Sequence, residues 1–354
     1  MGDMKKTSSL ADLGVDADIG KSIFKNIYHA VMDTPTKSYT TKITIVGVGN
    51  VGMAIAHTIL TQDIVEELAL IGTNFDKLQG EMLDLQHVAA FLPRVQIQAD
   101  TDYAITARSN LCIIAAGSRQ NPRESRLDLL QHNLKIFTSI VPKLVEKSPG
   151  CLLLVVTNPV DVLTYITWKL SGFPPNRVIG SGTNLDSSRF RFLLADYLNV
   201  NAQDVQAYMV GEHGDSSVAL WSSISVGGVP ILSFVTNKSE EFEQQVLENI
   251  RKKVVHSAYE VIRLKGYTSW AVGYSVANLA RSLLRDQRKI HPVSLLSKGF
   301  YGIGDDIEVF LSLPAMLGRS GVLSVAQITL TDVEKERLQN SAKILWEIQR
   351  QLNI

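Results

Sequence analysis

The stretch Ile43-Thr-Ile-Val46 runs directly into Gly47-Val-Gly-Asn-Val-Gly52, so that three glycines follow a short apolar run. In a turn between a strand and a helix, Gly47 permits the tight turn and Gly49 lets the backbone approach a pyrophosphate. Gly52 lets the helix pack closely on the strand. The stretch therefore predicts a strand, a glycine-rich turn and a helix that together bind a dinucleotide.

The helix predicted after this turn covers residues 52–62, and Asn50 and Val51, which precede it in the turn, are counted with the cofactor site. Its free N–H groups and its dipole stabilise the negative charge of a phosphate group. Taken alone, the glycine pattern also fits a close-packed turn with no ligand. The pattern of strands and helices and the other motifs of the chain are needed to distinguish the two interpretations.

Short β-branched runs alternate with longer segments of helical periodicity from residue 42 onward. This alternation is typical of βαβ units and of a parallel sheet. The predicted strands are 43–47, 67–71, 111–115 and 152–156, and the predicted helices are 52–62, 76–86 and 128–147, so that each strand is followed by a crossover helix. The predicted fold class is α/β, a doubly wound parallel sheet of the Rossmann type.

The pattern changes beyond about residue 183. A long charged helix is predicted from Ser239 to Leu264 with Gly266 at its end, and Thr331-Asp-Val-Glu334 is a capping box that opens a final helix. We therefore expect an N-terminal arm at 1–39, a dinucleotide-binding domain at 40–183 and an α+β catalytic domain at 184–354.

Composition argues for small-molecule chemistry. The chain of 354 residues holds 35 basic and 35 acidic side chains, so no bulk charge attracts it to nucleic acid or to an anionic membrane. Its two cysteines, Cys112 and Cys151, lack a metal-like or redox-like spacing, which favours a reducing compartment and no metal site. The longest apolar stretch carries Asn158, Pro159 and Asp161, which a lipid-facing helix could hardly bury. We expect a cytoplasmic protein without a membrane span.

The N-terminal arm contains an apolar stripe at helical spacing, formed by Ile23, Phe24, Ile27, Tyr28 and Val31. The arm mixes acidic and basic residues, unlike a transit peptide or a secretory signal. We expect a helix that packs on its own subunit or on a neighbouring one, rather than on a membrane.

Five further motifs occur in a fixed order along the chain. They are Gly117-Ser-Arg-Gln-Asn-Pro-Arg-Glu-Ser-Arg126, Val156-Thr-Asn-Pro159, Asn184-Leu-Asp-Ser-Ser-Arg189, Gly211-Glu-His-Gly-Asp-Ser216 and Tyr267-Thr-Ser-Trp270. Together with the glycine turn they resemble the L-lactate dehydrogenases, in the plant-like form with an extended N-terminus. The resemblance covers residues 40 to 354, and it implies NAD as cofactor, a small 2-oxo or 2-hydroxy acid as substrate, and a homotetramer.

Reduction of a 2-oxo acid needs a proton donor at the carbonyl oxygen while nicotinamide delivers hydride, and histidine titrates in the right range. The resemblance places His213 in that role, although a lone histidine among glycines is more often a turn residue. Asp186 should hydrogen-bond its far nitrogen, which fixes the tautomer and stabilises the protonated ring. Without the motif, Asp186 could equally cap a helix.

Three further polar residues complete the implied substrate site. Arg189 lies three residues after Asp186, on the same helical face, where its planar fork can bind a carboxylate with two hydrogen bonds. Arg126 would close over the substrate and polarise its carbonyl, whereas its structural alternative is a solvated turn. Asn158 is a poor core residue and should bind carbonyl oxygen or cofactor.

Substrate choice depends on Gln120, because malate dehydrogenases, which are similar, carry an arginine there for the second carboxylate of oxaloacetate. A neutral amide favours a pyruvate-sized substrate. Thr268 and Ala258 line the same pocket by the resemblance. Arg119, counted with the cofactor site, and Arg123 flank Gln120, and either could turn inward, so malate or broad 2-oxo acid chemistry stays an alternative.

Gly72 departs from the resemblance, because it stands where lactate dehydrogenases carry the acid that binds the adenine-ribose hydroxyls, roughly twenty residues past the glycine turn. Its absence predicts weaker NAD binding and relaxed use of NADP. Arg123 in place of a loop glycine, Ala115 for a threonine, and Val272 for an isoleucine over the nicotinamide are further departures. They leave a second alternative, a nucleotide-binding paralogue with weak turnover.

Overall fold

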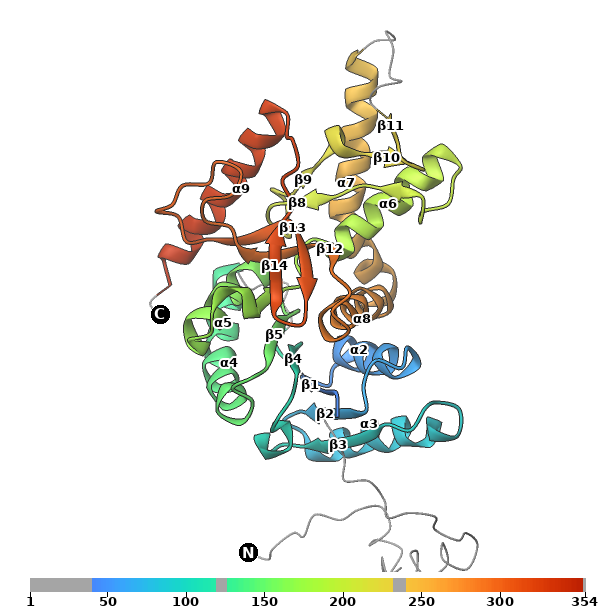
Figure 1. Cartoon of the computed structure of the whole chain (residues 1–354), viewed down its shortest axis with the longest axis vertical. Coiled ribbons are helices and arrows are strands. Elements are labelled where there is room, and N and C mark those ends of the chain that lie inside the picture. The colour runs from blue at the N-terminus through green and yellow to red at the C-terminus, as the bar shows by residue number, and fades with distance from the viewer. Residues whose placement is uncertain (1–39, 119–125, 232–239, 353–354) are drawn as a thin grey trace, which may run out of the picture. The chain divides into compact units, whose positions relative to one another are not determined.

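The computed structural model describes residues 40–118, 126–231 and 240–352 (Figure 1). Residues Thr41–Ile354 form one compact unit. The predicted arm at 1–39, with its apolar stripe, lies outside the described residues, as do Arg119, Gln120, Arg123 and Ser239.

One nine-stranded sheet runs through the unit in the order β14-β13-β12-β6-β5-β4-β1-β2-β3. Its parallel part follows the doubly wound order 3-2-1-4-5-6. The parallel strands are β1 (Lys42–Val46), β2 (Glu67–Ile71), β3 (Gln96–Asp100), β4 (Leu111–Ile114), β5 (Leu152–Val155) and β6 (Val178–Gly180). The predicted Rossmann fold is confirmed.

Strands β1, β2, β4 and β5 match the predicted runs to within one residue at each end. Helices α2 (Asn50–Thr61), α3 (Phe75–His87) and α4 (Arg126–Lys147) match to within two. Each of the four predicted strands leads into a helix, as expected, whereas β3, which was not predicted, is connected to β4 by a 3₁₀ turn at Tyr103–Thr106.

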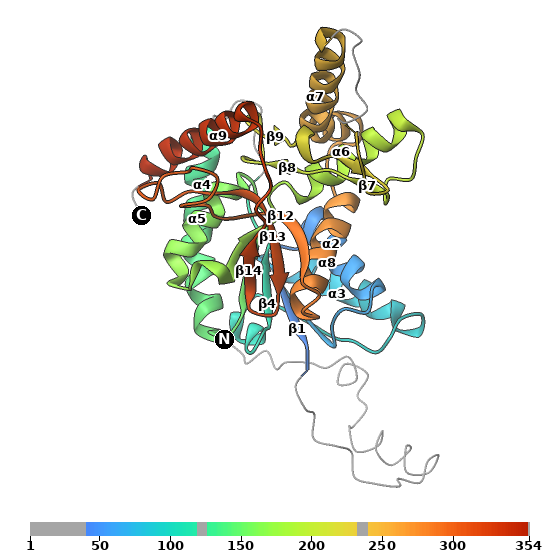
Figure 2. The same ribbon diagram turned by 45° about the horizontal axis from the view of Figure 1, so that its top comes forward.

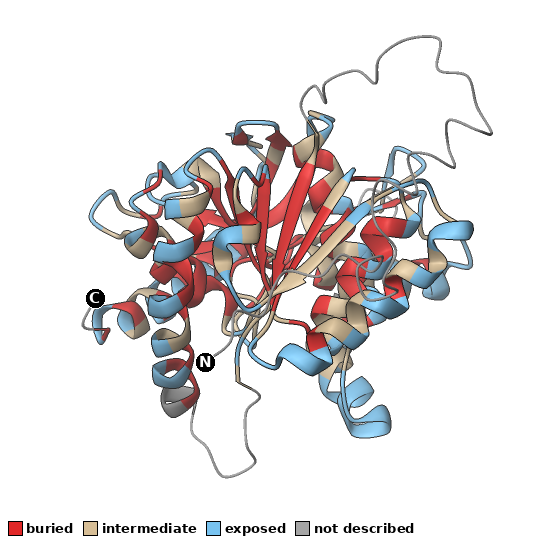
Figure 3. Ribbon diagram, turned by 90° about the horizontal axis from the view of Figure 1, so that it is seen from below, coloured by how far each residue is buried: buried red, intermediate tan, exposed pale blue. Residues whose placement is uncertain are grey.

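Helices cover both faces of the sheet. Helices α4 and α5 (Val160–Ser171) lie together on one side, and α2 lies beside α8 (Trp270–Leu284) on the other (Figure 2). Figure 3 shows the strands buried between helices whose outer surfaces are exposed. Strands such as β1 and β4 are therefore buried along their whole length, which explains the continuous apolar sequence of β4 and the run of β-branched residues in β1.

Three antiparallel strands extend the sheet beyond β6, namely β12 (Lys289–Leu296), β13 (Phe310–Gly318) and β14 (Gly321–Val325). Strand β12 joins the parallel part where Ser294 pairs with Gly180. The result is a mixed sheet.

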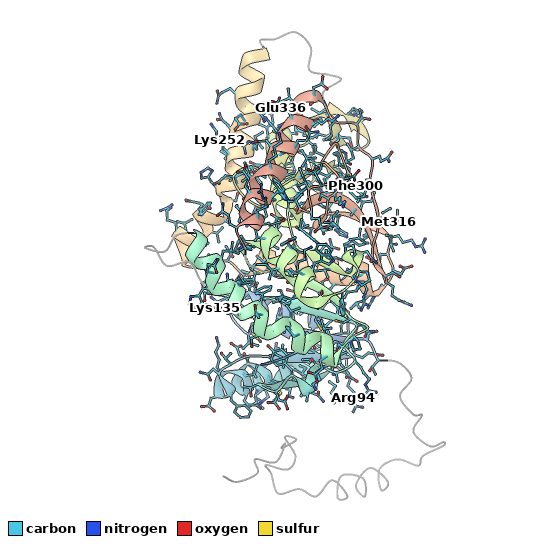
Figure 4. The ribbon with its side chains drawn as sticks, turned by 90° about the vertical axis from the view of Figure 1, so that its left-hand side faces the viewer. Arg94, Lys135, Lys252, Phe300, Met316 and Glu336 are labelled. Carbon is cyan, nitrogen blue, oxygen red and sulfur yellow. The ribbon has the colours of Figure 1, made fainter. Side chains whose placement is uncertain are left out.

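The remaining elements surround this addition. They are α6 (Asn184–Leu198), β7 (Val205–Gln206), β8 (Met209–Val210), β9 (Val218–Ala219), β10 (Ser225–Val226), β11 (Val229–Pro230), α7 (Glu240–Lys265) and α9 (Asp332–Arg350). The capping box of α9 is confirmed, since Thr331 and Glu334 bind each other's backbone N–H. Figure 4 labels Lys135 on α4, Lys252 on α7 and Glu336 on α9, and all three charged side chains are exposed.

Candidate active site

The glycine turn connects β1 to α2 at the point where the strand order reverses. Gly47 has φ +102°, and a Cβ there would lie 2.5 Å from the backbone nitrogen of Ala116 on the loop after β4. A Cβ at Gly52 would lie 1.8 Å from the carbonyl oxygen of Gly47. No side chain fits at either position, because the backbone of the turn is folded tightly against itself and its neighbour.

Gly49 is different, because a Cβ there would meet no atom within 4 Å. It caps α2, whose first turn from Asn50 carries no acidic residue. Asn50 is exposed and Val51 is half-buried. The turn thus offers open space and a helix N-terminus with its positive dipole end, which fits the diphosphate of a dinucleotide.

Gly72 follows β2 and lies against this turn. The N–H of Gly47 donates to the carbonyl oxygen of Ile71 at 2.8 Å, and a Cβ at Gly72 would lie 2.8 Å from Cγ2 of Val48. Position 72 is therefore adjacent to the turn, and the space for a side chain there is partly filled by Val48.

His213 and Asp186 form the central pair of the site. Nδ1 of His213 lies 2.5 Å from Oδ2 of Asp186, although 27 residues separate them in sequence. Because a carboxylate accepts hydrogen bonds, Nδ1 carries the proton, which leaves Nε2 to exchange a proton with a ligand. The side chain of His213 is 24% exposed and that of Asp186 only 8%, so the histidine is the accessible member.

The electrostatics of the pair favour a protonated ring. Burial disfavours the charge of His213, but the adjacent Asp186 carboxylate outweighs it and raises the pKa of His213 to about 9. Burial likewise opposes the charge of Asp186, while His213 and Arg189 lower the pKa of its carboxyl group below the usual value. Near neutral pH the arrangement holds an imidazolium beside a carboxylate.

Arg189 completes this cluster from the same helix, α6. Its Nη1 donates to Oδ1 of Asp186 at 2.9 Å, so the predicted neighbours on one helical face are in contact. Asp186 thus shares its two oxygens between a histidine and an arginine. The guanidinium keeps further N–H groups that can bind a ligand carboxylate.

Asn158 follows β5 with an exposed side chain, and its peptide bond to Pro159 is cis. Its carbonyl oxygen accepts from Nδ2 of Asn133 at 3.0 Å, and Oδ1 of Asn133 accepts from the N–H of Ser118 at 2.8 Å. Fully buried Asn133 on α4 therefore ties two site loops together. Sequence reasoning missed it, although a polar residue on the apolar face of a predicted helix was a usable signal.

The loop that carries His213 is held by residues that sequence reasoning did not assign to the site. Gly211 exchanges two backbone hydrogen bonds of 2.9 Å with Ser312 of β13. The N–H of Glu212 donates to Oγ of Ser341 on α9 at 2.8 Å. The N–H of His213 donates to Oδ2 of Asp161 at 2.7 Å.

No hydrogen bond or ion pair in the described part of the chain joins Thr268, Ala258 or Val272 to this cluster. Arg126 is the first residue of α4, and its side chain lies outside the described set, like Arg119 and Gln120. Thr268 and Ala258 are half-buried before α8 and within α7. Val272 is half-buried in α8, which packs on α2.

The described residues, 40–118, 126–231 and 240–352, contain neither a metal-binding cluster nor a membrane-spanning helix. No group of three or more histidine, cysteine or acidic side chains in them could hold a metal ion. No helix in them is both long enough and apolar enough to cross a membrane.

A doubly wound sheet with a glycine turn at its switch point and a histidine–aspartate pair in the same compact unit are typical of a nucleotide-dependent dehydrogenase. Two family models match the chain, the lactate/malate dehydrogenase NAD binding domain over residues 41–180 and the lactate/malate dehydrogenase alpha/beta C-terminal domain over residues 183–352. The chain belongs to the lactate/malate dehydrogenase family.

Similar proteins agree with this assignment. L-lactate dehydrogenase A of Hordeum vulgare is 61% identical over 350 residues, covering 97% of this chain and 98% of that protein. L-lactate dehydrogenase of Zea mays is 58% identical, with 97% and 98% covered. L-lactate dehydrogenase C chain of Fundulus heteroclitus is 53% identical, with 88% and 92% covered.

Proposed function

We propose that this chain is an NAD-dependent L-lactate dehydrogenase that interconverts pyruvate and L-lactate at the site around His213. The observation that carries the proposal is the contact of His213 with Asp186, which pairs an accessible proton donor with a buried carboxylate. Identity of about 60% to plant L-lactate dehydrogenases over nearly the whole chain supports the same activity.

His213 acts as the general acid in pyruvate reduction and as the general base in lactate oxidation. Its Nε2 gives a proton to the carbonyl oxygen, while Asp186 holds the ring through Nδ1 and stabilises the imidazolium. Since the pKa of His213 is raised to about 9, most of the protein carries the proton at neutral pH. Reduction is favoured there, and lactate oxidation needs higher pH.

Arg189 binds the substrate carboxylate through the N–H groups that Asp186 does not use. Arg126 and Asn158 polarise the substrate carbonyl, as the resemblance implies. Thr268 and Ala258 line the pocket for the substrate methyl group.

The cofactor is NAD, whose reduced form supplies a hydride to the carbonyl carbon when bound. Gly47, Gly49, Asn50, Val51 and Gly52 would hold its diphosphate at the start of α2. Arg119, Asn158 and Val272 would contact its remaining parts. We also propose weakened discrimination against NADP, because Gly72 has no carboxylate to accept from the ribose or to repel a 2′-phosphate.

Pyruvate is the proposed substrate because Gln120 is neutral, whereas oxaloacetate would bring a second carboxylate that needs a cation. Comparison of kcat/KM for the two acids tests this choice. A preference for oxaloacetate would mean that Arg119 or Arg123 supplies the charge, and malate chemistry would replace lactate chemistry.

The competing proposal of a nucleotide-binding paralogue without turnover is disfavoured by the intact cluster of His213, Asp186 and Arg189. Drift away from catalysis would not maintain a buried carboxylate that serves two partners. Steady-state kinetics with pyruvate and NADH separate the two proposals. Undetectable turnover at saturating cofactor would refute the enzyme.

We further propose a cytoplasmic homotetramer, with domains at 40–183 and 184–354 and an arm at 1–39 that helps assembly. Large side chains exposed along α7 and α8 support association, including Tyr259, Ile262, Leu264, Trp270 and Tyr274. Light scattering on the chain and on a variant lacking residues 1 to 38 tests the arm. A truncated protein that stays tetrameric at micromolar concentration would show that the arm is dispensable for assembly.

A further inference from the structure

Asp161 is a buried carboxylate directly beneath the backbone of the His213 loop. It lies in the first turn of α5, two residues after the cis-proline, and is 2% exposed. Its Oδ2 accepts from the N–H of His213 at 2.7 Å across 52 residues of sequence. The two oxygens of Asp186 bind the ring of His213 and Arg189, so Asp161 is a second carboxylate at the same histidine.

The surroundings of Asp161 give its charge little support. No ion pair in the described chain includes it, and its Oδ1 has no hydrogen-bond partner there. The titratable groups that face it are His213 and Glu212, both on the loop above, and the hydroxyl of Ser294 on β12 is its remaining polar neighbour.

These neighbours have opposite effects on the pKa of Asp161. Burial and, to a smaller extent, Glu212 raise the pKa of Asp161, Ser294 and His213 lower it, and the net result is a pKa of about 6. Burying a carboxylate that has a single backbone donor raises the free energy of the folded protein. An asparagine could accept from the same N–H without that cost. The chain therefore keeps a charge at a position where the hydrogen bond alone does not require one.

We propose that Asp161 is a positioning residue that fixes the backbone of His213 and, as a carboxylate, supplies a second negative charge that favours the protonated ring. The charge of Asp161 raises the pKa of His213, after the larger effect of Asp186, and Arg189 opposes both. The proposal rests on the proposed role of His213 as proton donor.

The variant Asp161→Asn separates the charge from the hydrogen bond, because the amide oxygen can still accept from the N–H of His213. The measurement is kcat/KM for pyruvate as a function of pH at saturating NADH. Pyruvate reduction needs protonated His213, so its alkaline limb should move to lower pH by about one unit when a charge at this range is removed.

Lactate oxidation gives a second measurement on the same variant. It needs neutral His213, so the acidic limb of its kcat/KM profile should move to lower pH by the same amount. A structural defect would lower both rates without moving both limbs in one direction. The paired shift is therefore specific to the charge.

Two further variants serve as controls. Asp161→Glu keeps the charge, so its limbs should stay near those of the unmodified enzyme even if kcat falls. Thr167→Val removes a buried hydroxyl from the same helix that donates to Leu163 instead of the active-site loop, and should leave both profiles in place. If Asp161→Asn does not fold, Asp161→Ser removes the same charge and takes its place.

Unchanged limbs in folded Asp161→Asn, with pyruvate turnover intact, would overturn the proposal, since Asp161 would then act only as a hydrogen-bond acceptor or be protonated. The proposed function would survive that result. Absence of pyruvate turnover in the unmodified enzyme would instead refute the proposed function. The two failures are thus distinguishable.

Discussion

The substitution Gly72→Asp tests how the enzyme recognises the adenine ribose. The backbone at Gly72 is not among the glycines with positive φ, so it accepts a side chain. The new Cβ would lie 2.8 Å from Cγ2 of Val48, and that methyl group has to move. Overpacking of this kind costs about 1 to 3 kcal/mol in the free energy of unfolding.

The loss of stability and the gain in NADH affinity appear in different measurements. The displacement of Val48 occurs with or without cofactor, so it lowers stability. The hydrogen bond from the ribose to the new carboxylate exists only in the complex and is worth about 1.5 to 3 kcal/mol, which lowers KM for NADH about ten- to a hundred-fold. The same carboxylate should raise KM for NADPH by repelling the 2′-phosphate.

Gly72→Ala is the matched control, because it adds the Cβ without the carboxylate. It should lose as much stability as Gly72→Asp and leave both cofactor KM values unchanged. Initial rates with varied NADH and NADPH give the two KM values of each variant, and thermal unfolding gives its stability. If folded Gly72→Asp leaves both KM values unchanged, residue 72 does not face the ribose and the reasoning is refuted.

Three other substitutions test the site. His213→Asn should lower kcat for pyruvate about 10²- to 10⁴-fold and leave NADH binding, followed by fluorescence, nearly unchanged; a variant that retains most of kcat contradicts the assigned proton donor. Gln120→Arg should shift the ratio of kcat/KM from pyruvate towards oxaloacetate, and an unaltered ratio would mean that residue 120 does not meet the substrate. Asp161→Asn should stabilise the protein above pH 6, because burial raises the pKa of Asp161 to about 6 from 3.8, so that ionisation opposes folding. That cost is absent below about pH 4 and reaches at most about 3 kcal/mol above pH 6, and equal unfolding temperatures of both proteins at pH 8 would exclude it.

The central strands were predictable because each is covered on both faces and must be apolar throughout, as in Leu111–Ile114. Strand β3 was not, since its sequence Gln96–Asp100 is polar and only half-buried at the sheet edge. Strand β6 has three residues, too few for a pattern.

Strands β12 and β13 were not predicted, because each contains a proline, which normally argues against a central strand. The structure places Pro292 directly opposite Pro314. The two residues that lack a backbone N–H therefore pair with each other, at a single position of the β12–β13 ladder. A single sequence cannot reveal that pairing, because it depends on the register of two strands.

Within the site, the sequence motifs identified His213, Asp186 and Arg189, which the structure brings together. They did not identify Asp161 or Ser341, which bind the histidine loop across 52 and 129 residues of sequence. Such contacts arise from the tertiary fold alone. The spacing of residues within the sequence motifs does not reveal these contacts.

The attachment of the His213 loop to β13 and α9 has a consequence for biosynthesis. A chain leaves the ribosome from its N-terminus, and early segments can fold first. The parallel strands β1 to β6 are complete by residue 180, but Ser312 and Ser341, which bind Gly211 and Glu212, are translated much later. A nascent chain should therefore acquire its nucleotide-binding half well before the histidine loop is fixed, so that activity begins only after the segments with Ser312 and Ser341 have been made and folded.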